Sequence, residues 1–185
     1  WKPVADEPYL QEIGEKIVTD KPVTAVVVYK DTAYAVVGGV LKELREGALK
    51  DAAGAPAGIT RLRLLDGAVW ASAAKGTFRF TSAKWERVDE RPFTDACEHL
   101  GQVYIATRDS IFRFDGGKLV NIRPADGYLS TDTTVIMEDF SQVLADPVEL
   151  GPVERIASYS GTLYLLRPGH LALLDGKTFF QDPVD

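Results

Sequence analysis

The chain has 185 residues, of which 45% are hydrophobic and 26% are charged, the composition of a globular protein with a sizeable core. Its formal net charge is -6 and its pI about 5.0, which disfavours binding to nucleic acid or anionic lipid because both are polyanions. No apolar run approaches the roughly 18 residues that a membrane-spanning helix needs, so we expect no membrane insertion in this segment.

Residues 1–22 form an N-terminal extension ahead of the regular part of the chain. Their apolar residues at positions 9, 10 and 13 fit either one or two helical turns or an added outer strand, and both alternatives stay open.

Four similar units follow from residue 23 onward, each built around one aromatic residue. Polar and apolar residues alternate in them, as in the two Phe-Arg-Phe segments at 78–80 and 112–114, which is the two-residue period of a strand with one face buried. Turn pairs such as Asp66-Gly67 and Lys75-Gly76 separate these runs. The four aromatic residues, spaced 36, 34 and 60 residues apart, are Tyr34, Trp70, Tyr104 and Tyr164.

The pattern predicts three or four short antiparallel strands in each unit. In chain order, the clearest expected strands are Val23–Tyr29, Ile59–Leu65, Val69–Ser72, Thr77–Phe80, Val103–Thr107, Ile111–Phe114, Arg155–Tyr159 and Leu163–Leu166. Tandem strand units of ~35–45 residues are typical of β-propeller blades, whereas the rungs of a β-solenoid are shorter. We therefore predict an all-β fold of four propeller blades, at about 23–58, 59–93, 94–152 and 153–185. The third blade includes an insertion at 123–152.

The second unit carries the clearest family signal. Its Asp66-Gly67-x-Val69-Trp70-Ala71-Ser72 stretch, followed by Gly76-x-Phe78-Arg79-Phe80, resembles the two-component-regulator propeller repeat, in which D-G-x-L-W-V-G-T precedes G-L-x-x-Y/F. The resemblance runs from Val23 to Asp185 and is strong in the second and third units, while the first lacks the Asp-Gly turn. It implies a sensor or scaffold propeller, usually periplasmic and usually part of a much longer protein.

The resemblance also orders the strands. It places 23–29, 59–65, 94–99 and 153–159 innermost, with the segments around the aromatic residues next. The aromatic rings would then pack between adjacent blades, each contributing about 2–3 kcal/mol by burial.

No motif for catalysis, a metal or a cofactor is present. The sequence lacks a G-x-S-x-G nucleophile elbow, a phosphate loop and a Rossmann glycine pattern. His99 and His170 lie in different units with no zinc-ligand spacing, and Cys97 is expected to be a small buried hydrophobe. We therefore expect no enzyme activity, no cofactor and no metal.

The interpretation that follows is a periplasmic or secreted module for ligand sensing or for protein or glycan recognition. The alternative is an accessory propeller domain of a carbohydrate-active enzyme. In either case the partner is a small-molecule or glycan ligand, or another protein domain.

Two groups of charged residues are candidates for ligand binding. The turns after the aromatic strands carry Lys75, Arg108 and Arg167, expected on the same face as the insertion around the mouth of the channel. Three cations there would hold an anionic ligand such as an acidic sugar or a carboxylate, although exposed turns also collect charge without any function. The insertion carries Asp132, Glu138 and Asp139, which a solvated acidic loop explains better than a calcium site, because the D-x-[DN]-x-[DN]-G pattern is absent.

The four units are expected to form only part of a ring. A closed propeller has about four to eight blades and leaves no sheet edge open. The fourth unit stops at Phe179-Phe180-Gln181, directly after its expected outer strand. We therefore expect further blades, from the rest of the chain or from a second copy, beside the first and last units. The alternative is that the first blade packs on the fourth, with residues 1–22 sealing the seam.

Overall fold

The computed structural model describes residues 16–81, 84–122, 128–129, 152–168, 170–175 and 178–183. All regular elements in this part of the chain are strands, and none is a helix, so the predicted all-β class is confirmed. Accordingly, no helix in the described ranges is long and apolar enough to cross a membrane.

The strands form four sheets, each built on four antiparallel strands in chain order. Blade 1 contains β1 (Val23–Tyr29), β2 (Thr32–Val37), β3 (Val40–Arg45) and β4 (Ala48–Asp51). Blade 2 contains β5 (Ile59–Leu65), β6 (Ala68–Ala73), β7 (Gly76–Thr81) and β8 (Lys84–Asp89). Blade 3 contains β9 (Asp95–His99), β10 (Gln102–Ala106), β11 (Ile111–Asp115) and β12 (Lys118–Asn121). Blade 4 contains β14 (Arg155–Tyr159), β15 (Thr162–Arg167), β16 (His170–Asp175) and β17 (Thr178–Pro183).

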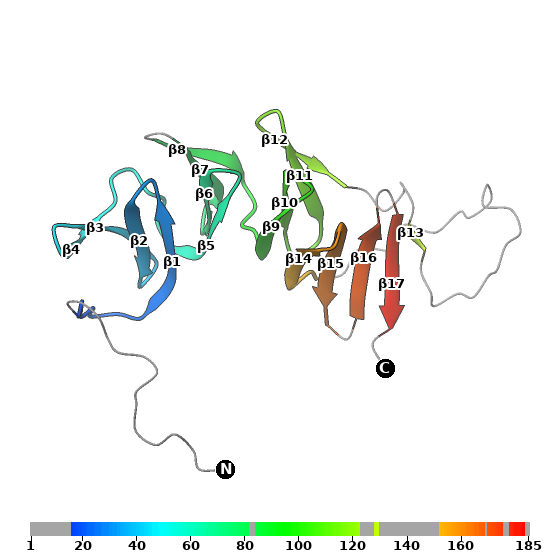
Figure 1. Cartoon of the computed structure of the whole chain (residues 1–185), viewed down its shortest axis with the longest axis horizontal. Coiled ribbons are helices and arrows are strands. Elements are labelled where there is room, and N and C mark those ends of the chain that lie inside the picture. Colours follow the sequence, from blue (N-terminus) through cyan, green and yellow to red (C-terminus); the bar gives the residue numbers. More distant parts are fainter. Residues whose placement is uncertain are drawn as a thin grey trace, which may run out of the picture.

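The blades stand side by side in an open row. Figure 1 shows blade 1 at one end of this row and blade 4 at the other, so the four sheets do not close into a ring. The first strands of successive blades contact one another, β1 with β5, β5 with β9, and β9 with β14. The fold is therefore four blades of a β-propeller with an open seam, and not the four-blade closure that was the alternative.

The strand positions follow the sequence prediction closely. The structure begins and ends β1, β5 and β14 at the predicted residues. Strand β10 runs one residue earlier than predicted, at Gln102–Ala106. All four repeat aromatics lie on the second strand of their blade.

The turn between the first and second strands has the same backbone form in every blade. Both central residues have positive φ, 48° and 59° at Asp66 and Gly67, as the type I′ hairpin turn requires. Blade 1 forms this turn with Lys30 and Asp31, at 46° and 61°. The Asp-Gly pair that the sequence of blade 1 lacks is therefore not needed for the hairpin.

The inner blades are covered on both faces, whereas the alternation in the sequence predicted one buried face. In β7, Phe78 and Phe80 pack into the cluster shared with blade 1. Between them, Arg79 points the other way and lies over the rings of Trp70 and Phe114, at 5.5 and 4.9 Å from their centroids. Blades 2 and 3 each have a neighbouring blade on either side, and the aliphatic stem of an arginine can cover apolar surface. The polar residue of the Phe-Arg-Phe pattern therefore also lies in an interface between two blades.

The insertion contributes one strand that the sequence did not predict. Strand β13 (Tyr128–Leu129) pairs in parallel with β17, Tyr128 opposite Phe179 and Leu129 opposite Phe180. This described part of the insertion extends the outer edge of blade 4, as Figure 1 shows.

Candidate functional site

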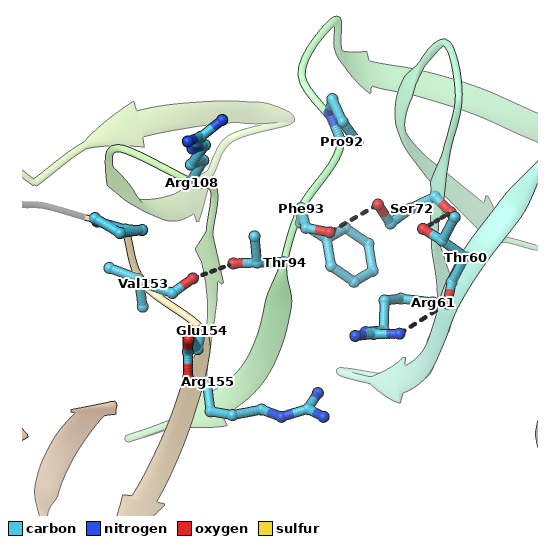
Figure 2. Close-up of a pocket in the computed structure, with 11 residues that line it drawn as sticks. Thr60, Arg61, Ser72, Pro92, Phe93, Thr94, Arg108, Val153, Glu154 and Arg155 are labelled. Atoms are coloured by element: carbon cyan, nitrogen blue, oxygen red, sulfur yellow. Dashed lines mark hydrogen bonds between the residues drawn. The ribbon is translucent and has the colours of Figure 1, made fainter. Parts of the chain in front are cut away.

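A hollow of about 600 Å³ lies where the first strands of blades 2, 3 and 4 begin. Residues just before or at the start of β5, β9 and β14 form most of its wall, joined by the turn between β10 and β11 (Figure 2). These first strands are the innermost ones of a propeller, so the hollow lies at its hub. The lining residues are Thr60, Arg61, Ser72, Pro92, Phe93, Thr94, Arg108, Pro152, Val153, Glu154 and Arg155.

A repeated threonine lies at the start of the inner strand in blades 1, 2 and 3. Thr24, Thr60 and Thr94 lie ten residues before the aromatic of their blade, and each hydroxyl donates to the backbone carbonyl twelve residues further on. Glu154 occupies this position in blade 4, where its backbone N–H donates to the carbonyl of Leu166 at 2.9 Å. Blade 4 therefore keeps the geometry and places a carboxylate at the hub.

Hydroxyl groups also join one blade to the next around the hollow. The Ser72 hydroxyl of blade 2 donates to the carbonyl of Phe93 at 2.7 Å. The Thr94 hydroxyl of blade 3 donates to the carbonyl of Val153, which precedes β14, at 2.8 Å. These bonds cross blade boundaries, so they hold the walls of the hollow in one arrangement, as Figure 2 shows.

Asp95 ties three blades together directly behind this wall. Its carboxylate is buried, accepts a hydrogen bond from Arg63 of blade 2 at 2.8 Å, and accepts a second from the backbone N–H of Ile156 in blade 4 at 3.2 Å. Both carboxylate oxygens are therefore engaged, and Asp95 is not among the residues that line the hollow.

Arg61 and Arg155 hold equivalent positions in blades 2 and 4, nine residues before the repeat aromatic. Figure 2 shows their side chains reaching from opposite walls into the same space. Within the described ranges, neither guanidinium forms an ion pair with a carboxylate, and the Arg61 guanidinium donates to the backbone carbonyl of Thr60 at 3.2 Å. With Arg108, three arginines and one carboxylate, Glu154, line the hollow. The described wall is therefore electropositive in spite of the net charge of -6.

The three predicted turn cations lie at the edge of their sheets where the inner strands begin. Arg108 lines the hollow, and its backbone carbonyl accepts a hydrogen bond from the N–H of Val153 at 3.1 Å. Lys75 is exposed in the turn between β6 and β7, and Arg167 is the last residue of β15. Neither Lys75 nor Arg167 lines this hollow, so Arg108 is the one predicted turn cation in its wall.

Both ends of the insertion reach this same edge, because Ile122 bonds to Ile111 at the start of β11 and Val153 bonds to the β10–β11 turn. The predicted acidic candidates Asp132, Glu138 and Asp139 lie outside the described residues.

The side chains of Cys97 and His99 are held inside the fold and do not line the hollow. Burial, together with the nearby charge of Asp95, raises the pKa of the Cys97 thiol to about 12, so this thiol stays protonated at neutral pH. His99 is buried and its Nδ1 lies 2.9 Å from the hydroxyl of Ser158 in blade 4. In the described part of the chain, no three His, Cys, Asp or Glu side chains are grouped so as to hold a metal ion.

Sequence reasoning missed Arg61, Arg155 and Glu154. The signal was present in the repeat itself, because aligning the units on their aromatics puts Thr24, Thr60, Thr94 and Glu154 in one column. The next column holds Ala25, Arg61, Asp95 and Arg155. The positions at the start of the inner strands therefore differ in charge from blade to blade, whereas the apolar positions are alike in all four blades. This difference marks the hub as the variable part of the blade.

No family model and no curated protein matches the chain. Among solved structures it is similar to the extracellular domain of a hybrid two-component system protein from B. thetaiotaomicron, with a TM-score of 0.65 and 16% identity, over 92% of this chain and 23% of that one. A second such domain from B. thetaiotaomicron has a TM-score of 0.50 and 11% identity, over 95% of this chain and 30% of that one. The computationally designed Ika4 protein has a TM-score of 0.51 and 13% identity, over 95% of this chain and 99% of that one.

The likeness shows the fold alone. This chain spans about a quarter of the length of the first of these proteins, 23% of that chain.

Proposed function

We propose that the chain is a non-catalytic recognition module of an extracytoplasmic protein, periplasmic or secreted, and that it binds an anionic ligand at the hub of its blades. The observation that carries this proposal is the pair of arginines, Arg61 and Arg155, that reach from opposite walls into one hollow and form no ion pair within the described ranges. Two-component sensing is supported by the extracellular domains to which the fold is similar and by the Asp66-Gly67 repeat pattern.

The ligand class follows from the chemistry of the wall. Two guanidinium groups facing one space repel each other, and a carboxylate or sulfate between them removes that repulsion. Guanidinium groups bind such groups through paired, charge-assisted hydrogen bonds. The hydroxyls of Thr60 and Thr94 lie beside them and donate to backbone carbonyls, so their oxygens keep the capacity to accept from sugar hydroxyls.

The size of the hollow also fits. At about 600 Å³ it is in the range of small-molecule sites and can take a saccharide of one or two rings. An acidic or sulfated saccharide is therefore the ligand that the described residues support best. Arg108, on the same wall, would contact a neighbouring ring or acid group of such a ligand.

Isothermal titration calorimetry with three disaccharides tests the proposal. The probes are the disaccharide of glucuronic acid and N-acetylglucosamine, its sulfated counterpart, and neutral cellobiose. We expect binding of an acidic probe and at least tenfold weaker binding of cellobiose. A double variant, Arg61→Gln with Arg155→Gln, should bind the acidic probe at least tenfold more weakly than the parent, since a hydrogen bond to a charged group contributes about 1.5–3 kcal/mol.

The matched control is Arg87→Gln, because Arg87 is an exposed arginine on the outer strand β8, away from the hollow. It should bind as the parent does. Equal affinity of the double variant and the parent for the acidic probes would remove the hub arginines from the site. If cellobiose binds as tightly as the acidic probes, the chain recognises saccharides but is not specific for anionic ones. If none of the three disaccharides binds, saccharides are not the ligand.

A further inference from the structure

We propose that Glu154 makes the hollow at the hub selective for anions that carry hydroxyl groups beside their acid group, as sugar acids do, over anions without hydroxyls. This inference rests on the proposed binding of an anionic ligand at the hub. It adds to that site a specificity-determining residue for the hydroxyl groups of the ligand.

Glu154 stands where the other three blades have a threonine. In those blades the hydroxyl of Thr24, Thr60 or Thr94 donates to the backbone carbonyl twelve residues further on, at 3.5, 3.3 and 3.1 Å. A carboxylate has no proton to donate, and in blade 4 the backbone N–H of Glu154 bonds to the equivalent carbonyl, that of Leu166, at 2.9 Å. The backbone therefore holds this end of the strand, and the side chain of Glu154 is not needed for that purpose.

Hydrogen bonds on either side fix the backbone that carries Glu154. The preceding residue, Val153, is 1% exposed. Its N–H donates to the carbonyl of Arg108 at 3.1 Å, and its carbonyl accepts from the Thr94 hydroxyl at 2.8 Å. Figure 2 shows Glu154 on the same wall of the hollow as Val153 and Arg155. The carboxylate is therefore attached to a fixed point of that wall.

The carboxylate of Glu154 has no partner within the described ranges. The residue is exposed and lines the hollow. No ion pair of the described residues joins it to the arginines of the wall, although three of them line the same space. Both carboxylate oxygens are therefore open to a ligand in the hollow.

Charge decides which kind of ligand group can lie beside Glu154. An anionic group would be repelled by the carboxylate, and an ammonium group would be repelled by the guanidinium groups of Arg61, Arg108 and Arg155. A neutral hydroxyl escapes both repulsions and donates to the carboxylate through a charge-assisted hydrogen bond. The two oxygens can accept from two neighbouring hydroxyls, such as those on a sugar ring.

Two parts of the site would then recognise two parts of the ligand. Arg61 and Arg155 bind the acid group, and Glu154 binds hydroxyls of the same ring or of the next one. An anion without hydroxyls is repelled by Glu154 and gains no hydrogen bond in return, so it should bind more weakly although it satisfies the arginines.

Isothermal titration calorimetry with two matched monoanions tests this inference. Methyl glucuronoside and cyclohexanecarboxylate both have a six-membered ring and one carboxylate, and only the first has ring hydroxyls. We expect the parent to bind methyl glucuronoside about tenfold more tightly than cyclohexanecarboxylate. Glu154→Thr, which introduces the residue of the other three blades, should bind methyl glucuronoside about tenfold more weakly than the parent. It should bind cyclohexanecarboxylate at least as tightly as the parent does, because the repulsion is removed.

Two further variants separate charge from shape. Glu154→Gln keeps the shape of the side chain and removes its charge, so it should change both affinities in the same directions as Glu154→Thr. Glu86→Gln is the matched control, because Glu86 is an exposed glutamate on the outer strand β8, outside the hollow. It should bind both probes as the parent does. Far-UV circular dichroism of every variant should match that of the parent.

The outcomes distinguish this inference from the proposed function. If the parent binds the disaccharide of glucuronic acid and N-acetylglucosamine but does not prefer methyl glucuronoside, the inference is overturned and the anion site stands. The same holds if Glu154→Thr retains the preference, or if it loses affinity equally for both probes, as a structural residue would. If the parent binds none of these ligands, the proposed function and the inference fail together.

Discussion

Asp95 of blade 3 accepts a hydrogen bond from Arg63 of blade 2 at 2.8 Å and, through its other oxygen, one from the backbone N–H of Ile156 in blade 4 at 3.2 Å. One carboxylate thus links three consecutive blades next to the hub. In the ion pair between Asp95 and Arg63, the aspartate is buried and the arginine is partly exposed to solvent.

Asp95→Ala should lower the free energy of unfolding by about 2–3 kcal/mol, because it leaves the Ile156 N–H and part of the Arg63 guanidinium without a partner. Urea denaturation followed by fluorescence measures the change. Asp115→Ala is the control, since Asp115 forms a longer, exposed pair with Arg113 and should stay within about 0.5 kcal/mol of the parent. If both variants unfold at the same urea concentration, Asp95 does not tie the blades together.

Trp70→Ala should cost about 3–5 kcal/mol, because it removes a fully buried ring from the interface between blades 2 and 3. The ring also holds Arg79 by a cation–π contact and donates from Nε1 to the carbonyl of Leu65 at 3.3 Å. Thermal or urea unfolding reports the loss. Leu100→Ala, at an exposed turn residue, is the comparison and should change little. A midpoint near that of the parent would mean that Trp70 does not hold the two blades together.

His99 makes the stability depend on pH. Burial lowers its pKa below the usual 6.5, so between pH 6.5 and that lowered value the unfolded chain binds a proton that the folded chain does not. The unfolding free energy should therefore fall as the pH falls from about 7 to 5, and stability is greater on the alkaline side. His99→Gln should flatten this slope while retaining a polar group near Ser158. An unchanged slope in the variant would assign the pH dependence to other groups.

Local sequence signals predicted the blades well. The alternation around Tyr34, Trp70, Tyr104 and Tyr164 and the turn pairs are properties of neighbouring residues, and they determine strand and hairpin positions directly. The turn of blade 1 was predicted less well, because Lys30 and Asp31 adopt positive φ without a glycine. Hairpin pairing on either side holds them in that conformation.

Contacts between blades could not be predicted in the same way. The Asp95 bonds to Arg63 and Ile156 join residues 32 and 61 positions apart, and they depend on how far each sheet is turned relative to the next. Strand β13 was missed because two residues, Tyr128 and Leu129, carry no periodic signal. The hub arginines were not predicted, because exposed charge is expected in turns, whereas Arg61 and Arg155 lie at the start of inner strands.

The measurement that tests recognition at the hub most directly is a titration of the chain labelled with ¹⁵N-arginine. The ligand added is the disaccharide of glucuronic acid and N-acetylglucosamine, the side-chain Nε–Hε signals are followed by NMR, and Arg→Lys variants assign them. We predict that the Arg61 and Arg155 signals shift together and saturate, while those of Arg45 and Arg87, which pair with Glu43 and Glu90, stay in place. Shifts confined to Arg45 and Arg87, or an unchanged spectrum at saturating ligand, would contradict the account.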